Sequence, residues 1–129
     1  MTQTRSRSIP DGLVVELSRC KVLPGASAEA YRWMAVLNDR LEECVATLDR
    51  ERMAIEIIFR LKENGEDYLF WVSVHGTGGQ GLDPGTAIDR DHIEQGQRTK
   101  EPGWTEAEPQ LLLLPDPVRN AVLSWALRG

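Results

Sequence analysis

Glu56 stands in the middle of a strongly apolar stretch, EIIFRLKENGEDYLFWVSVH (residues 56–75), where a carboxyl group could act as an acid or a base. Burial beside Trp71 would disfavour the charged carboxylate and raise its pKa toward neutrality, which suits general acid–base catalysis. The alternative is an ion pair between Glu56 and Arg60, two residues along the same strand face, because structural ion pairs also perturb pKa values. Glu16, on a neighbouring predicted strand, presents the same alternatives.

The chain contains two histidines, and both border the glycine-rich segment 76–85. His75 ends the strand before this segment, and His92 lies on a predicted short helix after it. An imidazole titrates near neutral pH, so either histidine could relay a proton. The alternative for His92 is a structural role, with its ring held by Asp89 three residues earlier.

A metal site is a less well supported interpretation of the same residues than acid–base catalysis. Two histidines with Glu56 or Asp89 would give a two-histidine, one-carboxylate set of ligands. Their spacing matches no recognised metal motif, so we expect neither a metal nor another cofactor. The segment GTGGQG also lacks the pattern of a phosphate-binding loop, and we expect a flexible lid or a plain connection there.

The side chains expected around Glu56 could form a pocket for an apolar organic molecule. A tryptophan such as Trp71 is more often a core or dimer-interface residue than a ligand platform, but in a cleft it can be both. Cys20 and Cys44 have no basic neighbours that would activate a thiolate, so we expect both to be inert. The predicted substrate-binding residues are Glu16, Ile58, Arg60, Trp71, Ser73 and Asp89.

A β-hairpin positions these residues, and its register follows from its turn. Asn64-Gly65 is a dipeptide favoured in type I′ turns, because both central residues there have φ > 0. Alternation along the two strands then gives an apolar face, which we expect helices to cover, and a more polar face, which we expect to be open. The apolar face pairs Leu61 with Tyr68, Phe59 with Phe70, Ile57 with Val72 and Ile55 with Val74. The other face pairs Arg60 with Leu69, Ile58 with Trp71, Glu56 with Ser73 and Ala54 with His75.

The remaining elements follow from periodicity and from helix and turn signals. An apolar stripe from Tyr31 to Leu48 predicts one long helix, or two in line with a break near Asn38-Asp39, and Ser27 is the expected N-cap. Asp116, followed by Pro117, is typical of a helix start. The full set is a strand at 13–22, helical structure from 27, strands at 53–62 and 67–75, a loop at 76–85, a helix at 86–100, a strand buried on both faces at 110–115, and a final helix.

This order, β-α-β-β-α-β with a C-terminal helix, predicts an α+β fold of the ferredoxin-like type, with an antiparallel sheet and helices on one face. Residues 1–11 are expected to be a disordered leader and residues 12–129 a single domain. A bare sheet face carrying Trp71 would need cover. Two such faces packed together in a homodimer would make a dimeric α+β barrel.

Composition narrows the classes of function. The 129 residues carry a net charge of −5, and 41% of them are hydrophobic. The only basic cluster is the pair Arg5 and Arg7, which argues against nucleic-acid or membrane-surface partners. No apolar run approaches the ~20 residues of a membrane helix, and the two cysteines form neither a disulfide framework nor a metal knuckle. We therefore expect a cytoplasmic protein.

Four segments, VELSRCKVLPG, RWMAVLNDRLEECVATLDRERM, EIIFRLKENGEDYLFWVSVHG and AIDRDH, together resemble a family of small, uncharacterised bacterial proteins of unknown function. The resemblance covers roughly residues 13–95. The family's pattern includes Glu–x–x–Phe, Tyr–x–x–Trp and Ile-Asp–x–x–His, which correspond here to Glu56/Phe59, Tyr68/Trp71 and Ile88-Asp89/His92. The family in turn resembles the dimeric α+β barrel group, which includes cofactor-free monooxygenases, isomerases, cyclases and haem-degrading enzymes.

Two hypotheses of function follow. The first is a small cofactor-independent acid–base enzyme, an isomerase, a cyclase or similar, acting on an apolar organic molecule in a cleft on the open sheet face. Glu56 would be the base, and His75 or His92 would relay the proton. The second is a non-catalytic homodimer that binds a small molecule or a partner protein. Analogy with the scaffold favours the enzyme.

Overall fold

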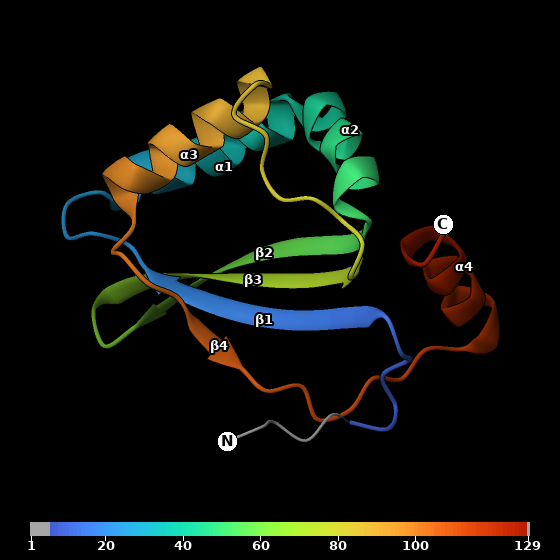
Figure 1. Ribbon diagram of the computed structural model, residues 1–129. Helices are drawn as coiled ribbons and strands as arrows, with labels where there is room; N and C mark the ends of the chain where they lie inside the picture. Colours follow the sequence, from blue (N-terminus) through green and yellow to red (C-terminus); the bar gives the residue numbers. More distant parts are fainter. Residues whose placement is uncertain (1–5, 129) are drawn as a thin grey trace.

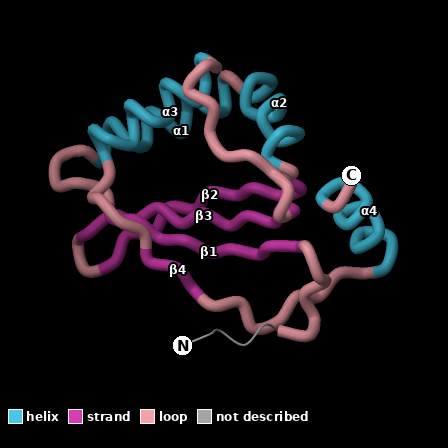
Figure 2. The backbone as a smooth tube through the Cα atoms, viewed as in Figure 1, coloured by secondary structure: helices cyan, strands magenta, loops and turns pink. Residues whose placement is uncertain are grey.

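The computed structural model describes residues 6–128 and shows a mixed α+β fold (Figures 1 and 2). None of the helices in this part of the chain combines the length and the apolar character needed to cross a membrane. The elements, in order, are β1 (Leu13–Lys21), α1 (Ser27–Asp39), α2 (Leu41–Glu51), β2 (Met53–Glu63), β3 (Glu66–Gly76), α3 (Ala87–Thr99), β4 (Thr105–Ala107) and α4 (Asp116–Ala126).

The four strands form one antiparallel sheet in the order β2-β3-β1-β4. Helices α1, α2 and α3 form a layer over one face of this sheet (Figure 1). Helix α4 lies apart from that layer and packs on one end of the opposite face, where Val122 and Ala126 join a buried cluster with Leu13 and Val74. The sheet therefore has one face covered by three helices and a second face covered only at one end.

The predicted hairpin register is confirmed. Asn64 and Gly65 have φ values of 51° and 77°, as the predicted turn requires, and the strand pairs match from Glu63 with Glu66 outward to Ile55 with Val74. The last predicted pair, Ala54 with His75, is wrong. A register irregularity between Met53 and Ile55 places Met53 opposite His75, as a β-bulge does when one strand carries an extra residue.

The predicted choice of covered face is wrong. The helices cover the face that carries Leu69, which is fully buried, and Ile58 and Trp71, which pack against the same cluster as Ala30. Phe59 on the opposite face is 52% exposed, and Ile57 and Leu61 are 42% and 44% exposed. Strand alternation divides the side chains into two sets, but it does not determine which set the helices cover.

The helical region consists of two helices, as one of the predicted alternatives required. The break falls at Arg40, directly after Asp39. Because α2 takes a new direction there (Figure 2), Leu41 and Val45 leave the apolar stripe and are exposed. Ser27 is the first residue of α1 rather than its N-cap, and its hydroxyl donates a hydrogen bond to Asp67 at 2.5 Å.

The predicted strand at 110–115 is wrong. The fourth strand is the three-residue β4, which pairs with β1 at Leu17–Arg19. Pro109 follows and has no N–H to continue the ladder. The leucines beyond it alternate: Leu112 and Leu114 pack against the core, whereas Leu111 and Leu113 are 67% and 77% exposed.

The N-terminal segment also differs from the expected disordered leader over its described part. Residues 1–5 lie outside the described residues. Ile9 is buried in the cluster that contains Leu13 and Val122, and the Ser8 hydroxyl accepts a hydrogen bond from the Leu112 backbone at 2.9 Å. Apolar burial and a backbone partner therefore anchor residues 6–11 to the C-terminal segment.

Candidate functional site

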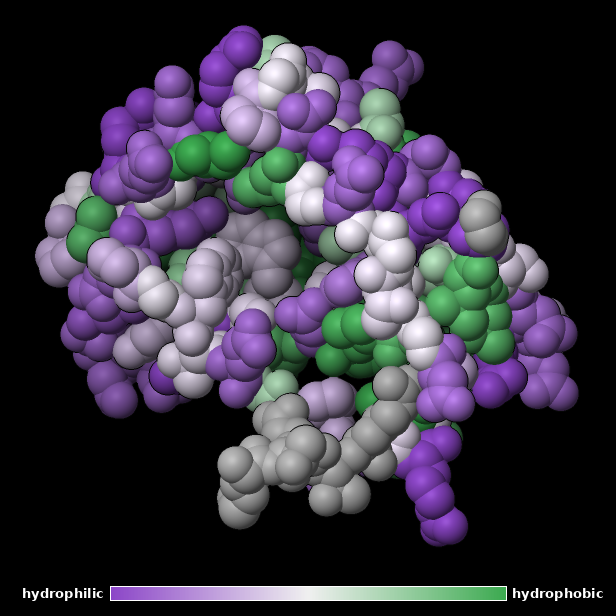
Figure 3. Space-filling view, in the orientation of Figure 1, coloured by the Kyte–Doolittle hydropathy of each residue, from purple (hydrophilic) through white to green (hydrophobic). Residues whose placement is uncertain are grey.

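A pocket of about 370 Å³ lies between the covered face of the sheet and helices α1, α2 and α3. In the space-filling view the surface is hollowed between the helix layer and the sheet (Figure 3). The predicted site residues that line this pocket are Glu56, Ile58, Trp71, Ser73, Asp89 and His92. The polar and aromatic lining residues that were not predicted are Ser18, Cys44, Thr47, Glu51, Trp104 and Glu106.

The sheet supplies the floor of the pocket in rows that run across the strands. Trp71 of β3 lies opposite Ile58 of β2 on one side and opposite Ser18 of β1 on the other. Ser18 in turn lies opposite Glu106 of β4. The next row, two residues along, pairs Glu56 with Ser73. Because side chains alternate between faces, both rows point toward the helices.

Glu56 has the properties expected of an acid or a base. Its side chain is exposed to solvent, but the protein around its carboxyl group still desolvates it and raises its pKa, and the negative charges of Glu51 and Asp89 raise it further. The predicted alternative, an ion pair with Arg60, is not formed. The Arg60 guanidinium lies over the Tyr31 ring instead, 3.5 Å from its centroid.

Glu51, on the last turn of α2, adds a second carboxyl group that sequence reasoning missed. Desolvation raises its pKa, and the nearby Thr47 hydroxyl, whose proton is donated to the Cys44 carbonyl, offsets part of that effect. Cys44, Thr47 and Glu51 follow one another at steps of three and four residues, so they share a helix face. That spacing was visible in the sequence, but the apolar stripe through Leu41 and Val45 pointed to the wrong face of α2.

His92 is held in its neutral form. Its Nδ1 accepts a hydrogen bond from the indole N–H of Trp33 at 3.2 Å, so the proton of the neutral ring is on Nε2. Burial lowers the pKa of the imidazole to about 4, and the nearby positive charge of Lys100 contributes to the same shift. His92 therefore enters the pocket as a hydrogen-bond donor and not as an imidazolium.

The predicted structural role of Asp89, holding the His92 ring, is not seen. Its buried carboxylate accepts hydrogen bonds from Arg50 at 3.1 Å and from the backbone N–H of Asp83 at 2.7 Å. Arg50 also forms an ion pair with Asp83 at 3.3 Å. These contacts tie the glycine-rich loop to α2 and α3, and they place Leu82 of that loop in the wall of the pocket.

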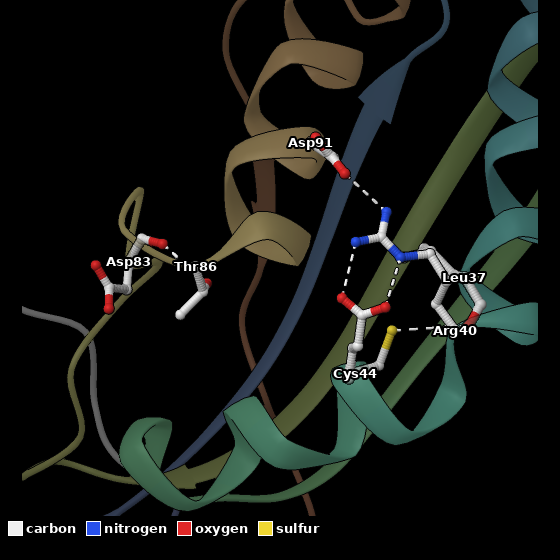
Figure 4. A network of polar contacts seen from close by, with 7 residues as sticks. Leu37, Arg40, Cys44, Asp83, Thr86 and Asp91 are labelled. Atoms are coloured by element: carbon white, nitrogen blue, oxygen red, sulfur yellow. Dashed lines mark hydrogen bonds and ion pairs between the residues drawn. The ribbon is translucent and has the colours of Figure 1, made fainter.

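A second polar network joins the helices above the pocket (Figure 4). The Arg40 guanidinium, at the break between α1 and α2, donates to Glu43 at 2.8 and 3.0 Å and to Asp91 of α3 at 2.8 Å. Near it, Cys44 Sγ donates a long hydrogen bond to the Leu37 carbonyl. The roof of the pocket is thus held together at the point where the helical layer changes direction.

The other predicted site residues lie elsewhere. His75 Nε2 is 2.6 Å from the Glu16 carboxylate, and neither side chain of this pair lines the pocket. Within residues 6–128, no group of three or more His, Cys, Asp or Glu side chains is arranged to hold a metal ion. Burial raises the pKa of both thiols, Cys20 and Cys44, which favours the unreactive protonated form.

Nothing in the sequence indicated that Trp104 and Glu106 would line the pocket. They reach the pocket because β4 pairs with β1 across more than eighty residues of chain, and the fourth strand was expected elsewhere. Residues of the motifs Glu–x–x–Phe, Tyr–x–x–Trp and Ile-Asp–x–x–His do meet in the pocket. They are Glu56, Trp71, Ile88, Asp89 and His92.

Comparison with known proteins places the chain in a family. No curated protein and no solved structure matches it. The profile of one family, described as a family of unknown function (DUF6176), matches residues 13–120 and thus spans β1 through the first turn of α4. Membership of a family of unknown function, expected from the resemblance, is thereby confirmed: the chain belongs to DUF6176.

Proposed function

We propose that the protein is a cofactor-independent acid–base enzyme acting on a small organic molecule in the pocket between the helices and the sheet. One observation carries the proposal. A carboxyl group whose pKa is raised by desolvation, Glu56, shares a pocket with a neutral imidazole donor, His92. Groups of this kind are suited to taking a proton from carbon and stabilising the resulting negative charge.

The proposed step is proton transfer next to a carbonyl group. The Glu56 carboxylate takes a proton from the carbon, and the electron pair of the broken C–H bond moves onto the carbonyl oxygen. The Nε2–H of His92 donates a hydrogen bond to that oxygen, while its Nδ1 remains bonded to Trp33. In a substrate with a C=C bond beyond that carbon, the electron pair then moves back from the oxygen, the carbonyl re-forms, and protonated Glu56 gives the proton to the far carbon of the C=C bond. The double bond has then moved into conjugation with the carbonyl, which completes an isomerisation with no cofactor.

This location corrects the predicted cleft on the open sheet face, because the acid–base residues lie on the face that the helices cover. Trp71 and Ile58 keep their expected role as apolar walls. His92 takes the part expected of either histidine, and His75 has none, since it is paired with Glu16 outside the pocket.

The test is a proton-exchange assay that does not need the natural substrate. A panel of ketones, 1,3-diketones and 2-oxo acids is incubated with the protein in D₂O, and loss of C–H signal is followed by proton NMR. We expect accelerated exchange for at least one class, abolished in Glu56→Gln and reduced in His92→Gln. Equal exchange with and without protein across the panel, or full exchange by Glu56→Gln, would contradict the proposal. Binding without exchange would favour a non-catalytic binding module.

We further infer that the domain is of the ferredoxin-like type and forms a homodimer like the dimeric α+β barrels. The strand order β2-β3-β1-β4, with helices before β2 and after β3, supports the fold. The exposed residues Leu17, Ile57 and Phe59 on the uncovered sheet face support the dimer, because a contiguous apolar face of this kind needs cover. The same apolar face of a second copy would provide this cover in a symmetric dimer.

A further inference from the structure

We propose that the molecule bound in this pocket carries an organic ammonium group, held against Trp71 and Trp104 with the Glu106 carboxylate as its counter-ion. The inference rests on the proposed function, since it names the class of substrate for the same site. Three features of the pocket carry it: the arrangement of the two indoles, the charges of the lining, and an ammonium group of the protein itself that already lies against the same rings.

The two indoles form an aromatic corner. Their centroids are 5.2 Å apart and their planes meet at 86°, so the edge of one ring meets the face of the other. Both line the pocket, and Trp104 is half exposed at its opening. The face of an indole carries partial negative charge and attracts a cation within about 6 Å of its centroid, more strongly than the other aromatic side chains do.

The charged groups that line the pocket also favour a cationic ligand. Among the described residues, no Lys or Arg side chain lines the pocket, whereas carboxyl groups do. Asp89 is neutralised by Arg50, but Glu51, Glu56 and Glu106 form no ion pair within residues 6–128. A concave site lined by charges of one sign concentrates the opposite charge, so the lining attracts cations. The Lys100 ammonium, which lies outside the lining, offsets part of this attraction.

The side chain of Lys100 already places an ammonium group against these two indole rings. Its Nζ lies 4.4 Å from the centroid of the Trp71 ring and 5.9 Å from that of Trp104. Lys100 is not among the residues that line the pocket, whereas both indoles are. The structure thus contains an intramolecular example of an ammonium group bound to the same aromatic pair.

The sheet register fixes where the ammonium group lies relative to the acid–base residues. Glu106, Ser18 and Trp71 are in one row across the sheet, and Glu56 with Ser73 forms the next row. Rows two residues apart along a strand are separated by about 7 Å. The substrate is therefore expected to carry its cation roughly 7 Å from the carbon that exchanges its proton. A cation bound there also lowers the pKa of Glu56, which converts it to the carboxylate base.

The test uses three soluble probes that each carry three methyl groups on one quaternary atom: choline, with a charged nitrogen there, and its neutral isostere 3,3-dimethylbutan-1-ol and the anion 3,3-dimethylbutanoate, both with carbon there. Binding is measured from the indole N–H signals in two-dimensional NMR. We expect choline to shift the Trp71 and Trp104 signals and to bind about tenfold more tightly than the neutral probe, as a cation–π contact with a counter-ion predicts. The anion should not bind.

Variants locate the site. Glu106→Gln and Trp104→Leu, both at exposed positions, should each weaken choline binding about tenfold. Glu108→Gln should leave choline binding unchanged, since Glu108 is also an exposed carboxylate but lies outside this pocket. Equal binding of choline and its neutral isostere, or full choline binding by Glu106→Gln, would overturn the proposal. Proton exchange without choline binding would refute only this inference, and choline binding without exchange would refute only the acid–base proposal.

Discussion

The indole N–H of Trp33 donates a hydrogen bond to Nδ1 of His92 across 3.2 Å, and this contact joins two residues that are 59 positions apart in the chain. An indole nitrogen can only donate, so Nδ1 must accept and cannot carry a proton. Protonating His92 would set two N–H groups against each other. The contact therefore acts in the same direction as burial and the charge of Lys100, and all three favour the neutral ring.

The first prediction follows from the depressed pKa of His92. In the unfolded chain this histidine titrates near 6.5, and in the folded protein near 4. Between these values the unfolded state binds more protons, so stability rises with pH in this window and is lost on acidification. The shift corresponds to ~3 kcal/mol at most. Urea unfolding at pH 4.5 and pH 7 should show a loss on acidification that is smaller in His92→Gln.

The direct check is an NMR titration of the His92 ring. Lys100→Met should raise its pKa, because the variant removes a positive charge that opposes protonation. Trp33→Phe should also raise it, since Nδ1 loses its donor. A wild-type midpoint near 6.5, or no response to Lys100→Met, would show that the ring is not held in its neutral form.

The second prediction concerns Glu56→Gln. Because Arg60 lies over Tyr31 and not beside Glu56, the variant leaves no cation unpaired, and the melting temperature should stay the same or rise. The raised pKa of Glu56 fixes the pH dependence: ionising the desolvated carboxyl in the folded state costs stability only as pH increases through that pKa. The gain in Glu56→Gln over wild type should therefore be larger at pH 8 than at pH 4, as measured by thermal unfolding.

Glu63→Gln is the matched control for losing one negative charge, since Glu63 is exposed beside the hairpin turn. Its melting temperature should not change in this way with pH. A large drop in the stability of Glu56→Gln that Arg60→Met restores would reveal an ion pair in solution, and would count against Glu56 as the acid–base group.

Local rules predicted the hairpin well. The turn at Asn64-Gly65 and the alternation of side chains both depend on residues close in sequence, and together they gave the register that places Glu56 beside Ser73. His92 and Asp89 were found because helix periodicity puts them near the loop. The same rules could not supply Trp33 as the partner of His92, because that contact depends on how α1 packs against α3.

The prediction of which sheet face the helices cover was wrong for a physical reason. The set that contains Phe59 is the more apolar of the two, so burial under helices was the natural expectation. In the structure α1, α2 and α3 cover the more polar set and enclose a pocket, and the apolar set is covered only at one end, by α4. The predicted strand at 110–115 is wrong for a related reason. Leu112 and Leu114 pack against the core from an extended loop, while the short β4 forms the edge of the sheet.

The third prediction concerns the glycine-rich loop beside the pocket. A Cβ added at Gly79 would lie 2.0 Å from the backbone carbonyl oxygen of Glu51, whereas one added at Gly78 would meet nothing within 4 Å. Gly79→Ala must therefore displace the loop or the end of α2, at a cost of ~1–3 kcal/mol. Gly78→Ala should leave the unfolding free energy nearly unchanged. Equal stabilities in urea would show that the loop does not pack on Glu51 in solution.

The last prediction concerns the uncovered face of the sheet. If Phe59 were buried under helices, Phe59→Ala would cost ~3–5 kcal/mol, but its ring is half exposed and a folded monomer should tolerate the change. The residue should matter for association instead. Wild-type protein should scatter light as a dimer at micromolar concentration, and Phe59→Lys should be a folded monomer, because a charge at the centre of an apolar interface cannot be desolvated without a partner.

Val45→Lys is the matched control, since Val45 on α2 is also an exposed apolar residue but does not line the groove that Phe59 shares with Leu41. It should remain dimeric. A monomeric wild type would refute the dimer, and dissociation by Val45→Lys with a stable Phe59→Lys dimer would place the interface on the helices. Because the pocket lies on the opposite side of the sheet, choline binding and proton exchange should survive in the Phe59→Lys monomer, which separates assembly from the chemistry of Glu56 and His92.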